Sequence, residues 1–302
     1  MEHSTTTIEK TDRGLAATAA AFVMLTKPRI IELLLITTVP SMIVAKGGMP
    51  DLWLVLVTVA GGTLAAGGAN TFNMYIDRDI DRLMKRTQGR PLVTGAVSPR
   101  AALLFGFALE ITAFVLFVTW VNLLAGLLAV GACLFYVFVY SLWLKRTSKQ
   151  NIVIGGAAGA APALIGWAAV TGSLALSPIL LFAIIFFWTP PHFWALSLLL
   201  KNDYAEANIP MLPVVAGVTS TKIHILLYTI LLIALTSLFF VMPTVGWFYL
   251  YSSLVLGLIY LGLSIYINIS SSKRVILSGY IYSMIYLALL FLAMIFDVIL
   301  YN

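Results

Sequence analysis

The chain has 302 residues, of which 61% are hydrophobic and only 10% are charged, whereas a soluble domain carries about a quarter charged residues. This composition excludes an ordinary soluble protein and indicates a polytopic membrane protein, and its single cysteine, Cys133, excludes a disulfide framework and a cysteine metal site. The net charge of +6 does not indicate nucleic acid, because the bases occur in short loops between apolar spans.

At the N-terminus, residues 1–22 are expected to form a flexible cytoplasmic tail, followed by one transmembrane domain over residues 23–302. The first twenty residues contain Glu2, Glu9 and Asp12 and no cleavable apolar core, which argues against a secretory signal and a transit peptide. We therefore expect a multi-pass protein of the cell inner membrane.

Nine apolar spans follow, each close to the roughly 20 residues that cross a bilayer. With the N-terminus inside, seventeen of the eighteen Lys and Arg residues fall on the cytoplasmic face, and only Lys46 falls outside. This asymmetry predicts an odd number of spans in an all-α bundle with a cytoplasmic N-terminus. The expected spans are residues 30–46, 53–72, 101–119, 122–143, 152–171, 177–199, 223–242, 246–269 and 276–300.

The polar loop after the second span carries the first candidate site. Asn73, Asp77 and Asp81 recur at i, i+4 and i+8, so in a helix they share one face, while Asp79 lies about 200° away. Carboxylate and amide oxygens in a row suit Mg²⁺, which binds phosphates through one or two carboxylates. Bases follow that can hold phosphate oxygens: Arg82, Lys85, Arg86 and Arg90. The alternative is a charged loop that only anchors two membrane helices.

A second polar loop over residues 201–213 follows four spans later, on the same face. This spacing suggests two four-helix halves and a ninth helix, with a shared site between the halves. If the loops face each other, Asp203 opposes Asp77 and Asp81 and can bind a second Mg²⁺. In the alternative, Asp203 caps the sixth span beside Lys201.

Other features within the spans have structural explanations. Runs of small residues, such as Gly155-Gly-Ala-Ala-Gly159, allow close packing of membrane helices. Glu32 lies near Arg29 and is expected to pair with it, whereas Glu110 has no obvious partner although a carboxylate is costly inside a membrane.

Several blocks along nearly the whole chain resemble the heme O synthase (protoheme IX farnesyltransferase) branch of the UbiA-type intramembrane prenyltransferases. The row of Asn73, Asp77 and Asp81 is typical of the wider family, and the blocks around His192 and Pro210 resemble the heme-modifying branch. The matching blocks are Leu25-Thr-Lys27-Pro-Arg29, Asn73-Met-Tyr-Ile-Asp77-Arg-Asp-Ile-Asp81, Arg86-Thr-Gln-Gly-Arg90-Pro-Leu, Tyr140-Ser-Leu-Trp-Leu-Lys145-Arg146, Asn151-Ile-Val-Ile-Gly155-Gly, Trp188-Thr-Pro-Pro-His192-Phe-Trp194, Asp203-Tyr204 and Ile209-Pro-Met-Leu-Pro213.

The resemblance implies a helical bundle around a central cavity, with both acidic loops at its cytoplasmic mouth. It places catalytic Mg²⁺ and diphosphate on Asn73, Asp77, Asp81 and Asp203. Many relatives have a second Asp four residues after the first in the second loop, but Ala207 stands there, so only Asp203 carries over. The expected diphosphate contacts are Lys27, Arg29, Arg86, Arg90, Tyr140, Lys145, Lys201 and Tyr204.

The resemblance also implies the reaction. The farnesyl group of farnesyl diphosphate is transferred to a vinyl group of heme b, and water adds to give heme O and diphosphate. For heme, His192 follows Pro190-Pro191 and is either an axial iron ligand or an imidazole bonded to the carbonyls that the prolines free. A heme A-forming enzyme or a terminal oxidase is an implied partner.

Two alternatives differ in what they require of the sequence. Another intramembrane prenyltransferase, acting on a quinone precursor or a chlorin, would share the Asn/Asp row but not the block around His192. A secondary transporter would place ionisable residues near the middle of several spans, where only Glu110 approaches that depth.

Overall fold

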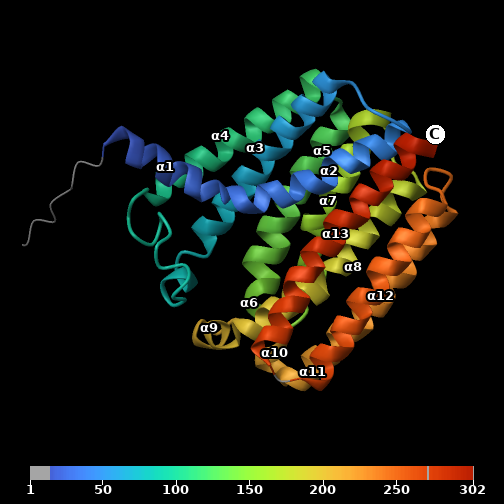
Figure 1. Ribbon diagram of the computed structural model, residues 1–302. Coiled ribbons are helices and arrows are strands. Elements are labelled where there is room, and N and C mark those ends of the chain that lie inside the picture. Colours follow the sequence, from blue (N-terminus) through green and yellow to red (C-terminus); the bar gives the residue numbers. More distant parts are fainter. Residues whose placement is uncertain (1–13, 271, 302) are drawn as a thin grey trace, which may run out of the picture.

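The computed structural model describes residues 14–270 and 272–301, without the side chains of residues 29–35 and 301. Every regular element in these residues is helical, and they contain no strand. Figure 1 shows a bundle whose long helices are α2 (Pro28–Lys46), α3 (Leu52–Ile76), α4 (Pro99–Trp120), α5 (Leu123–Leu134), α7 (Asn151–Thr171), α8 (Leu176–Leu199), α11 (Gly217–Leu238), α12 (Trp247–Ile269) and α13 (Lys273–Tyr301).

Shorter elements lie between these helices. A π-helical segment, η2 (Phe135–Leu144), continues α5 without a break, and α6 (Lys145–Thr147) completes that span. The remaining elements are α1 (Leu15–Thr26), η1 (Ile80–Arg82), α9 (Lys201–Glu206), α10 (Leu212–Val215) and η3 (Phe239–Val241). Part of the tail expected over residues 1–22 is therefore helical, because α1 begins at Leu15, and residues 1–13 lie outside the described chain.

Eight described helices are long and apolar enough to cross a membrane, and each coincides with an expected span to within several residues. Only helices satisfy every backbone hydrogen bond inside lipid without pairing to another segment, so the apolar runs predict these elements well. Helix α2 takes the place of the first expected span. Because the side chains of residues 29–35 lie outside the description, the count of nine spans stays a prediction.

Helices α7 and α8 form the centre of the bundle. They pack on each other, α7 also packs on α2 and α5, and α8 also packs on α11 and α13. The outer helix α4 instead exposes large apolar side chains, including Leu104 and Ile111, as expected for a surface that faces lipid.

Small residues allow this close packing, as expected from the glycine runs. A Cβ added to Gly166 on α7 would lie 2.4 Å from the backbone oxygen of Thr38 on α2, so the two backbones are in direct contact. On α3, a Cβ added to Gly68 would lie 2.7 Å from Oε1 of Glu110 on α4. Oε1 of Glu110 is buried and forms no hydrogen bond within the part of the chain that the structure describes, so its role stays open.

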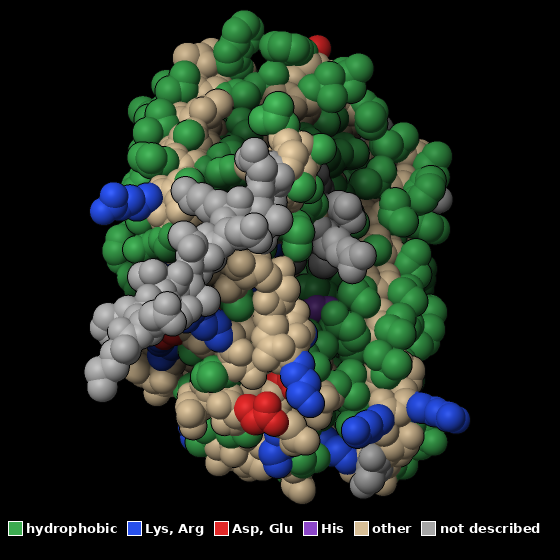
Figure 2. Space-filling model, turned by 90° about the vertical axis from the view of Figure 1, so that its left-hand side faces the viewer, with side chains coloured by type: hydrophobic (Ala, Val, Ile, Leu, Met, Phe, Trp, Pro, Cys, Tyr) green, Lys and Arg blue, Asp and Glu red, His purple; other side chains and the backbone are tan. Residues whose placement is uncertain are grey.

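The polar connections gather at one end of the bundle. In Figure 1, the teal loop of residues 77–98 lies at the left of the bundle, and α6, α9 and α10 lie below it and toward the lower end. On the face shown in Figure 2, most charged side chains lie at that end, and apolar side chains cover the upper part. The charge asymmetry of the sequence thus corresponds to one end of the fold.

Candidate active site

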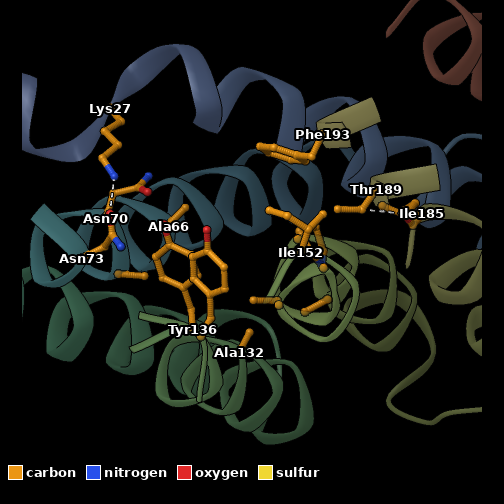
Figure 3. A pocket seen from close by; sticks show the side chains of 18 of the residues that line it. Lys27, Ala66, Asn70, Asn73, Ala132, Tyr136, Ile152, Ile185, Thr189 and Phe193 are labelled. Carbon is orange, nitrogen blue, oxygen red and sulfur yellow. Dashed lines mark hydrogen bonds between the residues drawn. The ribbon is translucent and has the colours of Figure 1, made fainter. Parts of the chain in front are cut away.

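A cavity of about 520 Å³ lies inside the polar end of the bundle. Its volume is within the range of small-molecule sites, about 300–1,000 Å³. Charged side chains line its mouth, and small or aromatic residues line its interior. Figure 3 shows Tyr136 pointing into the space between Asn73 and Ala66 on one side and Ile152 on the other, with Lys27 above Asn73. An apolar interior behind a charged mouth suits an amphiphilic anion.

Asn73, Asp77 and Asp81 lie one above the other, as their spacing predicts. Helix α3 ends at Ile76, but the Asp77 N–H donates to the Asn73 carbonyl (2.9 Å), and the Asp81 N–H donates to the Asp77 carbonyl (2.8 Å). The i to i−4 pattern therefore continues beyond the helix and keeps the three side chains on one side. All three are almost completely buried, at 2%, 0% and 0% exposure.

Each side chain of this row is held by a base from another part of the chain. Lys27, between α1 and α2, donates to Oδ1 of Asn73 (2.6 Å). Lys145 forms an ion pair with Oδ2 of Asp77, and Arg90 forms one with Oδ2 of Asp81 (2.6 Å). These contacts join residues that are 46, 68 and 9 positions apart in the sequence.

The two ion pairs leave one oxygen of each carboxylate without a partner. Oδ1 of Asp77 and Oδ1 of Asp81 are buried, and neither forms a hydrogen bond within the part of the chain that the structure describes. A buried acceptor without a donor is costly, so two such oxygens in one row are suited to receive a cation.

The residues present fit Mg²⁺ bound together with a substrate anion rather than a closed metal centre. The described residues contain no group of three or more His, Cys, Asp or Glu side chains around one point. Mg²⁺ commonly takes one or two carboxylates and completes its octahedron with phosphate oxygens and water. The free oxygens of Asp77 and Asp81, with Asn73 beside them, provide such a partial set.

Burial and neighbouring charges shift the pKa values of the ionisable groups around the row. Burial raises the pKa of the Asp81 carboxyl, and Asp77 raises it further, while Arg90 acts in the opposite direction. Burial lowers the pKa of Lys27 to about 7, and the positive charges of Arg90 and Lys145 contribute to this shift. The lysine also has a left-handed backbone conformation, with φ at +53°, which is uncommon for a residue other than glycine. An added anion would favour the charged form of Lys27.

The π-helical segment explains why Tyr136, Tyr140 and Lys145 all line this cavity. Tyr136 and Lys145 are nine residues apart, which is two and a half turns of an α-helix, so an α-helix would place them on opposite faces. With i to i+5 hydrogen bonds and about 4.4 residues per turn, the same interval is close to two turns. The rings of Tyr136 and Tyr140 stack, with centroids 5.4 Å apart.

Ser141 connects this segment to the acidic row. Its hydroxyl donates to the Tyr136 carbonyl (2.9 Å), five residues earlier, and accepts from Nδ2 of Asn73 (2.9 Å). Since Lys27 donates to Oδ1, the orientation of the Asn73 amide is set by both neighbours. The glycine at 155 makes room for the Tyr140 ring, because a Cβ there would lie 2.3 Å from that ring.

The second polar loop contributes less than expected. Tyr204 and Arg86 line the cavity, and the Arg86 guanidinium lies 5.7 Å from the centre of the Tyr204 ring. Asp203 and Lys201, in contrast, are not among the residues that line it. The described residues contain no group of three carboxylates that would join Asp203 to Asp77 and Asp81, and its role as a metal ligand stays a prediction.

Two bases predicted to hold phosphate oxygens also lie away from the cavity. Arg82 and Lys85 are exposed. Asp79, which the helical spacing excludes from the row, forms an ion pair with Arg146 (2.7 Å), and this hydrogen bond lowers its pKa to about 2. The side chains of Arg29 and Glu32, with the ion pair predicted between them, lie outside the described residues.

At the other end of the cavity, His192 on α8 lies between two aromatic rings. Its ring stacks on Trp188 with centroids 4.4 Å apart and on Tyr280 with centroids 4.8 Å apart. The hydrogen bond of His192 goes to the hydroxyl of Ser283 on α13 (2.7 Å). One of the two alternatives, an imidazole bonded to the carbonyls that the prolines free, is therefore wrong for the described residues.

Sequence reasoning missed Tyr136, Ser141, Tyr280 and Ser283. Tyr136 and Ser141 had a weak signal, because Tyr136 lies about one helical turn before Tyr140 and Ser141 directly follows it. Tyr280 and Ser283 had none, because a serine and a tyrosine in an apolar helix do not indicate which distant residue they contact.

Comparison with known proteins identifies similarity to membrane prenyltransferases. Residues 34–283 match the description "UbiA prenyltransferase family". A "Protoheme IX farnesyltransferase" of Synechocystis sp. is 48% identical over 297 residues, covering 97% of this chain and 94% of the relative. One from Roseiflexus sp. is 50% identical over 276 residues, which cover 91% of this chain but only 52% of that longer protein.

Solved structures support the fold. The structure "of a UbiA homolog from Archaeoglobus fulgidus bound to DMAPP and Mg2+" aligns with a TM-score of 0.64, covering 90% of this chain and 98% of that chain. Since the two sequences are only 19% identical, this likeness concerns the helical architecture.

Proposed function

This chain belongs to the UbiA prenyltransferase family, and on that premise we propose that it transfers the farnesyl group of farnesyl diphosphate to a vinyl group of heme b. Water is added in the same reaction, which gives heme O and diphosphate. Relatives at about half identity that carry the name protoheme IX farnesyltransferase favour heme over a quinone precursor or a chlorin. Family membership makes the chain an enzyme rather than a secondary transporter.

One observation supports the diphosphate end most directly. Two buried carboxylates, each with a free oxygen, are surrounded by the bases Lys27, Arg86, Arg90 and Lys145 at the mouth of an apolar cavity. Four bases against two carboxylates leave positive charge for an anion. Asp77, Asp81 and Asn73 would hold Mg²⁺, which stabilises the negative charge that develops on the leaving diphosphate.

In the first step, the bond between the farnesyl C1 and its oxygen breaks, and the electron pair goes to the diphosphate. Arg86, Arg90, Lys145 and Lys27 bind the oxygens on which this charge appears. The stacked rings of Tyr136 and Tyr140 line the adjacent cavity, where aromatic faces favour an allylic cation and exclude water that would capture it.

In the second step, the π electrons of the heme vinyl group form the new carbon–carbon bond. Water then adds to the carbon next to the porphyrin ring and releases a proton. Trp188, His192 and Tyr280 line the same cavity, so a flat acceptor held beside them can meet the farnesyl group between the α3 side and the α8 side.

The charge asymmetry supports an orientation with the acidic loops on the cytoplasmic side, and the inner-membrane location stays a prediction. The implied partner, a heme A-forming enzyme or terminal oxidase, stays a prediction from the resemblance. Co-purification of such a protein with the tagged chain from its own membranes would test it.

The function is tested with purified protein in detergent, supplied with heme b, farnesyl diphosphate and Mg²⁺, and with product masses read by chromatography and mass spectrometry. A heme that has gained a farnesyl group and one water is the expected product. Prenylation of a quinone precursor or a chlorin without any heme product would overturn the heme assignment. No prenylation of any acceptor would overturn the proposed activity.

A further inference from the structure

Ser283 lies at the centre of a small buried network behind His192. Its side chain is fully buried, at 0% exposure. The hydroxyl donates to the Tyr280 carbonyl (2.6 Å) and contacts Nδ1 of His192 (2.7 Å). The backbone carbonyl of Ser283 accepts the indole N–H of Trp188 (2.7 Å), so this one residue connects α13 to both Trp188 and His192 on α8.

The hydrogens available in this network determine the tautomer of His192. A serine hydroxyl has one hydrogen, and a carbonyl oxygen can only accept, so the hydrogen in the contact with Tyr280 comes from Ser283. The contact with His192 then needs its hydrogen from the imidazole. Nδ1 is therefore the protonated nitrogen, and the Ser283 oxygen accepts from it.

This tautomer leaves a lone pair on Nε2. His192 lines the cavity, and Nε2 forms no hydrogen bond with the residues that the structure describes. The rings of Trp188 and Tyr280 cover both faces of the imidazole, at interplanar angles of 18° and 26°, so the ring has little freedom to rotate. A fixed imidazole whose other nitrogen donates to a neighbour is the usual arrangement of a histidine that binds a metal.

We propose that Ser283 is a positioning residue for heme, because it accepts the Nδ1 hydrogen of His192 and so presents Nε2 to the heme iron. This inference rests on the proposed function, since heme b is the acceptor that brings iron into the cavity. His192 is the ligand, Trp188 and Tyr280 prevent rotation of its ring, and Ser283 sets its tautomer and strengthens its basicity.

The test measures heme binding without farnesyl diphosphate, by optical and electron paramagnetic resonance spectra of the purified protein titrated with heme b. The wild type is expected to bind heme with the spectrum of an imidazole ligand. Replacing His192→Ala should remove that spectrum, and added imidazole should restore it. Ser283→Ala should weaken heme binding by about 10–100-fold and alter the spectrum, as loss of such partners does at other metal sites.

Two further variants separate positioning from a general effect on packing. Ser283→Thr keeps the hydroxyl and should restore both affinity and spectrum. Ser253→Ala removes another fully buried serine, which donates to the Leu250 carbonyl (2.9 Å) on α12. Among the described residues it forms no hydrogen bond with this network, so the variant should leave both affinity and spectrum unchanged.

The outcomes distinguish the two proposals. If Ser283→Ala binds heme as the wild type does while His192→Ala does not, the positioning role is wrong. If His192→Ala leaves the heme spectrum unchanged, the ligand assignment is wrong, although heme can still be farnesylated. If the wild type neither binds heme nor farnesylates it, the proposed function itself fails.

Discussion

At the scale of single residues, Asp81 and Asp79 are only two positions apart, but one is buried in the cavity and the other is exposed to solvent. Asp81 is fully buried with one free oxygen in the cavity row, whereas the Asp79 side chain is 59% exposed and pairs with Arg146. Asp81→Asn keeps the shape and removes the charge that would hold Mg²⁺, so farnesyl transfer should fall by at least about 100-fold. Asp79→Asn should change it by less than about threefold, since exposed ion pairs contribute little.

The measurement is the steady-state rate at several Mg²⁺ concentrations. Asp81→Asn should also need more Mg²⁺ for half-maximal rate, and the heme spectrum of both variants should match that of the wild type. Equal losses in the two variants would mean that the acidic loop acts as a whole and that the buried row has no special role.

The lowered pKa of Lys27 predicts that kcat/KM for farnesyl diphosphate depends on pH. Its pKa, lowered to about 7, means that the side chain is charged below this pH and becomes neutral above it, so its attraction for diphosphate is present at low pH and is lost as the pH rises. The value of kcat/KM for farnesyl diphosphate, which reports the free enzyme, should therefore decline above pH 7. Lys27→Arg remains charged and should lack this decline.

The wild type and Lys27→Arg act on the same substrate, so the ionisation of the diphosphate itself affects both pH profiles equally and cancels when they are compared. Identical profiles between pH 6 and 9 would show that Lys27 does not titrate in this range or does not contact the diphosphate.

At the level of elements, α7 depends on a glycine where it meets α2. Gly166→Ala would place a Cβ 2.4 Å from the Thr38 backbone oxygen, and a backbone cannot move aside as a side chain can. The two helices would have to separate, at a cost of about 1–3 kcal/mol or more. Gly262→Ala on α12 meets nothing within 4 Å and should be neutral or stabilise by up to about 1 kcal/mol.

Unfolding of the two variants by heat in detergent, followed by circular dichroism, checks this difference. A Gly166→Ala protein as stable as Gly262→Ala would show that α2 and α7 are not packed backbone to backbone.

The elements themselves could be predicted from the sequence, because an apolar run of the right length in lipid has to be a helix. The expected spans agree with helices such as α7 and α8 to within a residue at either end. The π-helical segment could not be predicted, since its side chains are as apolar as those of the α-helix before it. The spacing rule of an α-helix consequently fails for Tyr136 and Lys145.

The same distinction applies to the candidate site. Asn73, Asp77 and Asp81 could be recognised because their relation is local, over two turns of one segment. Their partners Lys27 and Lys145 were expected near the diphosphate only through the resemblance, and the pairing of each with a particular oxygen depends on how distant helices pack. Ser283 contacts His192 across 91 positions of sequence, and no local pattern records that contact.

For the molecule as a whole, the charge distribution predicts that the acidic loops face the cytoplasm. Cys133 is the only cysteine, so Cys133→Ser gives a background for single cysteines. In that background, Gln88→Cys at the polar end should react with a membrane-impermeant maleimide only from the cytoplasmic side. Met49→Cys, which lies in the connection between α2 and α3 and is 69% exposed in the parent, should react only from the outer side.

Labelling of intact cells stripped of their outer membrane, compared with labelling of inverted membrane vesicles, provides the measurement. The reverse pattern would invert the topology, and labelling of both positions from one side would mean an even number of spans between them.

The π-helical segment has a consequence for how the length of this helix is constrained. A membrane helix accepts a substitution more easily than an insertion or a deletion. In this segment, the number of residues determines which side chains face the cavity. Deleting one residue between Phe135 and Leu144 would allow the segment to rewind, and Lys145 would turn by roughly a quarter of the circumference away from Asp77. In sequence alignments, a gap inside this helix should therefore mark proteins that bind a different substrate or have rebuilt the site.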